Sequence, residues 1–133
     1  QHGITGTSVD KISSFIQYGI RKGNVGTLWQ NIAFGLAMNQ NGNAITTENR
    51  DYIKRPYRGI PDELWQEMWA WAVETKNTGG NIKNANKAFM AKLNSISACY
   101  KRRISDHAYE EALRLFEATR SIGLAETVWD LLS

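Results

Sequence analysis

Two turns rich in glycine and threonine, one on each side of a short helical segment, constrain this chain more than any other feature. The first turn is His2-Gly3-Ile4-Thr5-Gly6-Thr7-Ser8, and the second is Gly19-Ile20-Arg21-Lys22-Gly23-Asn24-Val25-Gly26-Thr27. The segment between them has apolar residues at helical spacing, namely Val9, Ile12, Phe15 and Ile16. Thr7 is the expected N-cap of this helix, and Gly19 is the expected stop. Because helix N-termini and backbone N–H groups beside glycine bind anions, the pattern predicts two neighbouring phosphate turns.

The run from residue 20 to residue 25 is too short for another helix and is a candidate strand, although Gly23 weakens that interpretation. Two such turns at the ends of adjacent strands would face the same place. In a (β/α)₈ barrel that place is the C-terminal face, where phosphate sites commonly follow strands 7 and 8. His2, at the end of the first strand, would be well placed to ligate a metal above the barrel mouth.

The two motifs, in register across one helix, resemble the class II fructose-bisphosphate aldolase family and its tagatose-bisphosphate relatives. The matches to the family's His-Gly-Gly-Ser/Thr-Gly turn are His2, Gly3, Thr5 and Gly6. The matches to its last strand, Lys-x-Asn-Val-Gly/Asp-Thr, are Lys22, Asn24, Val25, Gly26 and Thr27. The sequence departs from the family pattern at two positions: Ile4 replaces a glycine, and Gly23 replaces an apolar residue.

The resemblance covers residues 1–40 and implies an α/β fold, the C-terminal part of a TIM (β/α)₈ barrel. The turn formers and basic residues that follow divide the chain into the last βαβα part of the barrel (1–40), a basic loop or linker (41–60) and a helical C-terminal extension (61–133). With that extension included, the chain itself is expected to be predominantly α-helical. The absence of an initiator Met at Gln1 also suggests a fragment or a processed chain.

The resemblance also implies site roles. His2 would be one zinc ligand, and the phosphate would bind to Gly3 and Thr5, with Gly26 and Thr27 completing the cradle. Asn24 would contact the triose part of the sugar-phosphate substrate. In this family Zn²⁺ polarises the carbonyl of dihydroxyacetone phosphate and stabilises an enediolate for carbon–carbon bond cleavage or formation. A monovalent cation is a further cofactor that the resemblance suggests.

The resemblance predicts a lyase only for the intact parent protein. The family's other zinc ligands and its proton-handling acid lie earlier in the barrel, in sequence that this chain does not contain, so we expect the segment alone to be inactive and assign it no catalytic residue. We expect the remainder of the barrel and further copies of the protein as partners. In this family a basic residue of the tail can reach a phosphate, which makes Arg55 and Arg58 minor candidates.

The remainder of the chain predicts helices. Pro61-Asp62-Glu63 is typical of a helix start. An apolar stripe follows at Trp65, Met68, Trp69, Ala72 and Val73, and Trp71 lies off it, so this helix should bury two faces or meet a partner. A long helix is expected from about Ile82 to Arg102, a restart at Ser105-Asp106 and a last short helix at 125–132. The lone cysteine, Cys99, is expected to be buried as a small apolar residue.

Composition sets limits on location and partners. A single cysteine makes a reducing, cytoplasmic setting the default, and no apolar run is long enough to cross a membrane. The formal charge of +3 permits nucleic-acid binding without demanding it, so nucleic acid is not an expected partner. Simpler interpretations remain open: the two turns could be plain helix caps, His2 an ordinary terminal residue, and the whole chain a free-standing helical module that binds nucleic acid or protein.

Overall fold

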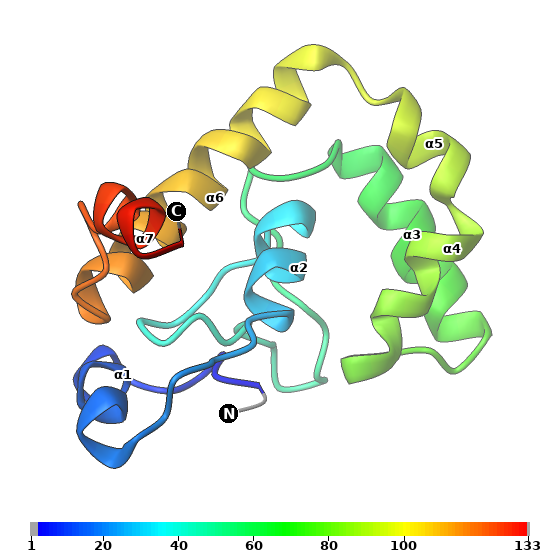
Figure 1. Cartoon of the computed structure of the whole chain (residues 1–133). Helices are drawn as coiled ribbons and strands as arrows, with labels where there is room; N and C mark the ends of the chain where they lie inside the picture. Colours follow the sequence, from blue (N-terminus) through cyan, green and yellow to red (C-terminus); the bar gives the residue numbers. More distant parts are fainter. Residues whose placement is uncertain (1–2, 133) are drawn as a thin grey trace.

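The computed structural model describes residues 3–132. Within this range the chain is helical and no β-strand forms. The α-helices are α1 (Val9–Ser14), α2 (Thr27–Phe34), α3 (Asp62–Glu74), α4 (Ala85–Ala88), α5 (Met90–Ser95), α6 (Ala98–Ala118) and α7 (Ala125–Leu132), and the 3₁₀ helices are η1 (Phe15–Tyr18) and η2 (Gly79–Asn84). Figure 1 shows α6 crossing from the side of α3, α4 and α5 to the side of α1.

The prediction of an α/β fold, the C-terminal part of a TIM (β/α)₈ barrel, is wrong. Residues 20–25, the candidate strand, have no regular secondary structure. The backbone N–H of Ile4 donates to the carbonyl of Asn24 at 3.1 Å, so the two motifs touch, but no ladder develops from this contact. A parallel strand needs neighbouring backbones along its edges, whereas residues 20–23 border a cavity that they share with side chains of α1 and α6. The predominantly α-helical character of the chain is confirmed.

The helix between the two turns forms close to its predicted place. It begins after Ser8, one residue beyond the expected N-cap Thr7, and continues from α1 into η1. Gly19 ends it in the left-handed conformation, with φ 72°, as predicted. The second helix, α2, starts after Gly26 and stops at Gly35, which is also left-handed, with φ 74°.

Residues 41–60 form no helix. Three isolated antiparallel bridges fold this part of the chain back on itself: Leu36 with Lys54, Met38 with Ala44, and Thr46 with Tyr52. One basic residue of this mostly exposed loop is covered. The side chain of Lys54 is only 9% exposed, and its Nζ pairs with Asp62 at 2.9 Å and donates to the carbonyl of Arg58.

The main hydrophobic core lies between α2, α3 and the segment from η2 to α4. Its buried members are Phe34, Leu36, Ile60, Leu64, Trp65, Met68, Ala72, Ile82 and Ala85. Aromatic rings dominate: Trp65 stacks on Trp69 with centroids 5.9 Å apart, and Phe34 lies 5.2 Å from Trp65. Trp71 packs edge-on against Phe89, so α3 buries a second face as predicted.

The helix breaks in the second half of the chain differ from the prediction. The expected continuous helix from Ile82 to Arg102 is divided, and a new helix starts after Ser97, whose extended backbone makes it the N-cap of α6. No restart occurs at Ser105 and Asp106, because both are exposed on the solvent side of α6, where a polar residue does not interrupt a helix. Cys99 is exposed in the first turn of α6, so its predicted burial is wrong.

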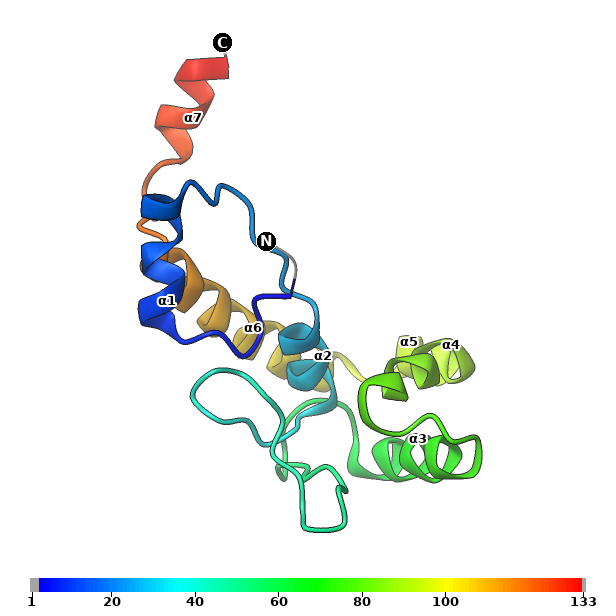
Figure 2. The same ribbon diagram turned by 90° about the horizontal axis from the view of Figure 1, so that it is seen from below.

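The last predicted helix is confirmed as α7, and Figure 2 shows it projecting from the rest of the molecule beyond α1. A second, smaller apolar cluster joins the N-terminal segment to the end of α6 through Ile4, Ile12 and Ala118. In the part of the chain that the structure describes, no helix combines the length and the apolar character needed to span a bilayer.

Candidate functional site

The two predicted phosphate turns lie against each other. Besides the bond between Ile4 and Asn24, the Thr5 hydroxyl accepts a hydrogen bond from the backbone N–H of Leu28 at 3.2 Å. Thr5 therefore satisfies one of the free N–H groups at the start of α2, a helix that has no N-cap side chain of its own because residue 26 is glycine. The first turn thus caps the helix that follows the second turn.

Three of the predicted site residues lie at the start of α2 or just before it. Asn24 is half-buried and holds Ile4 through its carbonyl, Gly26 is the N-cap, and Thr27 is the first helical residue. Gly3 lies across from them in the first turn, with φ 65°. A β-carbon added at Gly3 or at Gly26 would meet nothing within 4 Å. The backbone at both glycines is therefore open to an approaching anion.

Gly6 has a different role. A β-carbon there would meet the Asn43 side chain at 2.7 Å, and the N–H of Gly6 donates to the Asn41 carbonyl at 2.9 Å. Gly6 therefore allows the loop at residues 41–43 to pack against the first turn. The same loop is fixed to α2 by Asn31, the buried polar residue of this helix, whose side-chain amide donates to the Gly42 carbonyl at 2.9 Å.

Both departures from the family pattern fall in one contact. Ile4 is 7% exposed and belongs to the smaller apolar cluster, so its side chain turns inward instead of standing beside the phosphate turn. Its Cδ1 atom lies 3.1 Å from the position of a β-carbon on Gly23. The larger residue at position 4 thus occupies the space left by the smaller residue at position 23.

Arg114 is a basic residue near the first turn, and no motif in the sequence indicates its position there. It lines a small cavity with Thr5, Thr7 and Asn41, and its guanidinium binds Glu111 and the Gln40 carbonyl. This cavity has a volume of about 10 Å³, room for one water molecule at most, so a phosphate would have to bind on the open side of the turns. Arg114 and Thr5 are far apart in the sequence, and the packing of α6 brings them together in space.

The other tail candidates, Arg55 and Arg58, lie near His107 in the middle of α6. Burial lowers the pKa of His107, and the positive charge of Arg58 lowers it further, against the opposing effect of Glu111. The Nδ1 atom of this histidine is buried and has no hydrogen-bond partner. Both effects favour the neutral form of His107, which lies on a different part of α6 from Arg114.

The predicted zinc ligand, His2, lies outside the described residues. Zinc sites in proteins take three or four ligands from the side chains of His, Cys, Asp and Glu. No group of three or more such residues that could hold a metal occurs within residues 3–132. Residues 3–132 therefore do not make up a zinc site by themselves.

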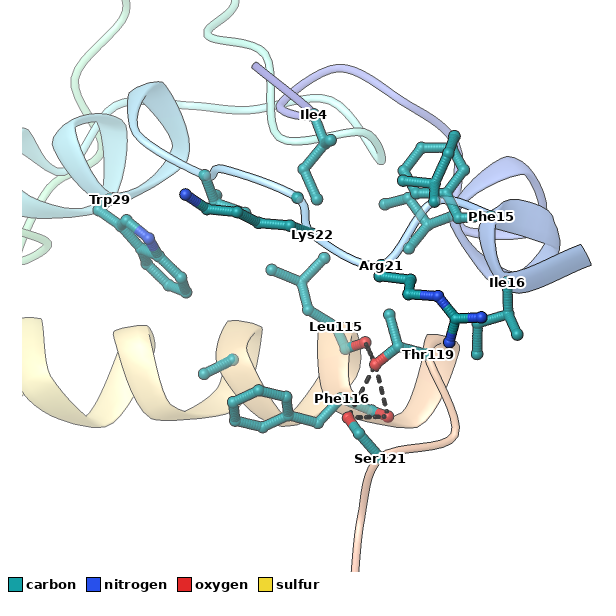
Figure 3. A pocket seen from close by; sticks show the side chains of 15 residues that line it. Ile4, Phe15, Ile16, Arg21, Lys22, Trp29, Leu115, Phe116, Thr119 and Ser121 are labelled. Atoms are coloured by element: carbon teal, nitrogen blue, oxygen red, sulfur yellow. Dashed lines mark hydrogen bonds between the residues drawn. The ribbon is translucent and has the colours of Figure 1, made fainter. Parts of the chain in front are cut away.

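A larger cavity lies beside the turns, with a volume of about 650 Å³. We call it the α1–α6 cavity, because α1, η1 and the end of α6 form its walls together with the segment between η1 and α2. The lining residues from these parts are Ile12, Phe15, Ile16, Ile20, Arg21, Lys22, Gly23, Val25, Leu115, Phe116 and Thr119. Figure 3 shows Phe15, Leu115 and Phe116 around this space, with Arg21 and Lys22 on the segment that borders it. The lining is mostly apolar, and the charged residues come from one side.

Comparisons with models of protein families, with curated protein sequences and with solved structures find no match to this chain.

Proposed function

We propose that residues 3–7 and 24–28 form the phosphate-binding part of a sugar-phosphate site, and that this chain contributes the site to a class II metal-dependent aldolase. The proposal combines the two sequence motifs with one observation: the Thr5 hydroxyl accepts the N–H of Leu28, which joins the first turn to the start of α2. A phosphate site of this kind requires the two turns to be adjacent, and it does not require a barrel.

The open space around the backbone at Gly3 and Gly26 supports the proposal that an anionic ligand binds there. Neither glycine has a neighbouring atom where a side chain would begin, so a phosphate oxygen can approach the backbone closely. The start of α2 adds a positive partial charge from its unsatisfied N–H groups. Phosphate would then lie against the N–H groups of Gly26 and Thr27, with Asn24 beside the sugar carbons.

Backbone NMR of the 133-residue chain during titration with inorganic phosphate and with dihydroxyacetone phosphate tests the site. We expect the amide signals of Gly3, Gly26 and Thr27 to shift. The variant Gly26→Ala should lose these shifts, because its methyl group occupies the approach path. Its φ of −122° is negative, so alanine does not need a left-handed backbone there.

Gly80→Ala is the matched control, since a β-carbon at Gly80 also meets nothing within 4 Å and this residue lies in η2. It should bind phosphate as the unmodified chain does. Shifts confined to other residues, or unchanged binding by Gly26→Ala, would contradict the proposed phosphate site.

The aldolase activity needs its own experiment, on the complete polypeptide that carries this segment. We expect zinc-dependent cleavage of a ketose bisphosphate, lost together with zinc in His2→Ala. Full activity and full zinc content in that variant would reject the role of His2. Phosphate binding without any cleavage would leave the turns as a phosphate site and reject the aldolase.

A free-standing binding module is the second candidate, and the loop at residues 55–58 favours it. Tyr57 is 80% exposed between the exposed side chains of Arg55 and Arg58, an arrangement of aromatic and cationic groups that suits single-stranded nucleic acid. Binding of a single-stranded oligonucleotide that weakens steeply with salt and is lost in Tyr57→Ala would support this function. Equal binding by Tyr57→Ala would reject it.

A further inference from the structure

The α1–α6 cavity is an apolar surface that nothing in the described chain fills. Ile16, in its wall, is 62% exposed, and Phe116, opposite, is 56% exposed. Figure 3 places Phe15 and Ile16 on one side of the space and Leu115 and Phe116 on the other. Exposed apolar surface of this kind, bordered by polar residues, marks a site that binds another apolar group.

The helix α7 is an apolar surface of complementary kind. Its residues Ala125, Val128, Trp129 and Leu132 recur at the spacing i, i+3, i+4 and i+7, which puts them on one face. This face is exposed along its length: Trp129 is 72% exposed and Leu132 is 75% exposed. An amphipathic helix of eight residues is not stable in water unless its apolar face packs against something.

The charge on α7 makes it a more specific partner for the cavity than an uncharged apolar helix would be. Glu126 lies in the first turn of α7 on the flank of the apolar face, so this edge of α7 is acidic. Arg21 carries a positive charge at the border of the α1–α6 cavity, beside Ile16. An acidic amphipathic helix therefore fits the cavity in both its apolar and its charged parts.

In a single chain, α7 points away from the α1–α6 cavity. α7 follows α6 after a short connection, residues 119–124, and two residues of that connection, Thr119 and Ser121, belong to the cavity wall. From there α7 leads away from the molecule, as Figure 2 shows. Every described residue from Arg120 to Leu132 is exposed.

We propose that α7 of one chain docks into the α1–α6 cavity of a second copy and that the second copy returns its own α7, giving a dimer with two-fold symmetry. Each chain has one such helix and one such cavity, so a reciprocal exchange fills both at once and closes the assembly. Because α7 begins at the rim of its own cavity, the two contacts lie side by side near the symmetry axis.

Sedimentation velocity of the 133-residue chain over a wide range of concentrations is the first measurement. We expect a dimer for the unmodified chain and a monomer for Trp129→Ala/Leu132→Ala. Both side chains are exposed within the single chain, so the fold of the monomer should survive, as far-ultraviolet circular dichroism would verify. The matched control is Tyr109→Ala, which removes a 69% exposed aromatic ring from α6 outside the cavity and should leave the dimer intact.

A charge exchange tests the partner surfaces. Arg21→Glu and Glu126→Arg should each weaken the dimer, and the double variant should restore it, since it rebuilds the pair with reversed signs. A dimer that survives both single variants unchanged, or a double variant no better than the worse single one, would overturn the proposed docking geometry.

Cross-linking separates exchange between copies from docking within one chain. With Cys99 replaced by serine, the variant Ile16→Cys/Leu132→Cys treated with a short bis-maleimide should give a covalent dimer on denaturing gels. A cross-linked monomer would show that α7 docks in its own cavity, and a chain monomeric at all concentrations would exclude the exchange. Either result would overturn the proposal.

Discussion

The side chain of Ile4 lies over the backbone of Gly23, with its Cδ1 atom 3.1 Å from the position that a β-carbon on Gly23 would occupy. The two positions are those at which this chain departs from the aldolase motifs. A large residue on the first turn and a small one on the second therefore form one packing unit, which lets Ile4 reach the cluster that it shares with Ile12 and Ala118.

This contact predicts that substitutions at positions 4 and 23 are coupled. Gly23→Val should destabilise the fold by about 1–3 kcal/mol through overpacking, and Ile4→Ala by about 2–4 kcal/mol through the cavity it leaves. In Ile4→Ala/Gly23→Val the valine fills part of that cavity, so the loss should be smaller than the sum by at least about 1 kcal/mol. Urea unfolding measures all three, and strict additivity would show that the two side chains do not share the space.

Gly35 and Gly59 form a second close backbone contact. A β-carbon on Gly35 would lie 2.1 Å from the Arg58 carbonyl oxygen, and one on Gly59 would lie 2.2 Å from the Gly35 nitrogen. Alanine at either position should cost at least about 3 kcal/mol, because backbone atoms must move. Gly79→Ala is the control: Gly79 also has a positive φ, 59°, but open space around it, so only the conformational cost of about 1–2 kcal/mol should appear. Equal losses at all three positions in urea unfolding would refute the steric argument.

His107 predicts a dependence of stability on pH. Its pKa in the folded chain is lowered from the ordinary 6.5, first by burial and then by Arg58. As the pH falls through 6.5, the unfolded chain takes up a proton before the folded chain does, so the free energy of unfolding decreases until the pH passes the folded pKa. Urea midpoints measured on both sides of pH 6.5 should show this loss in the unmodified chain and in His2→Gln, but not in His107→Gln. A slope that persists in His107→Gln would assign the effect to other groups.

We expect the same substitution to change the stability of the fold by unequal amounts at Lys54 and Lys92. The Lys54 side chain is 9% exposed, pairs with Asp62 and donates to the Arg58 carbonyl, whereas Lys92 pairs with Glu67 in a position where its side chain is 57% exposed. Lys54→Met should cost about 1–3 kcal/mol, because it leaves a carbonyl and a carboxylate without their partner. Lys92→Met should cost less than about 1 kcal/mol, the usual value of an exposed pair. Thermal unfolding of both variants provides the comparison, and the reverse order would contradict the assigned burial.

Local signals in the sequence predicted local structure well. The stripe from Trp65 to Ala72 and the acidic start at Asp62 fixed α3, and Gly19 ended η1 as expected, because periodicity and left-handed glycines act within a few residues. Ser105 and Asp106 were misleading, since a polar pair marks a helix start only when it does not lie on the exposed face of a longer helix.

Features that depend on distant parts of the chain could not be predicted in this way. Residues 20–25 have the sequence of a short strand, yet a strand exists only where other strands supply its hydrogen bonds. The contact of Arg114 with the Gln40 carbonyl follows from the packing of α6 alone. The adjacency of the two turns was anticipated from the motifs, but the bond from Leu28 to Thr5 that joins them was not.

The position of α6 also has a consequence for the order in which the molecule assembles. Its Ile104 packs against the aromatic core, and its Ala118 closes the cluster of Ile4 and Ile12 at the opposite end of the sequence. Such distant contacts form slowly, because a long stretch of chain must be ordered before they bring any gain. During synthesis on the ribosome, the core around α3 can form before α6 has emerged. The N-terminal turns cannot pack against α6 until then. The two turns that begin the chain should therefore be among the last parts to become fixed.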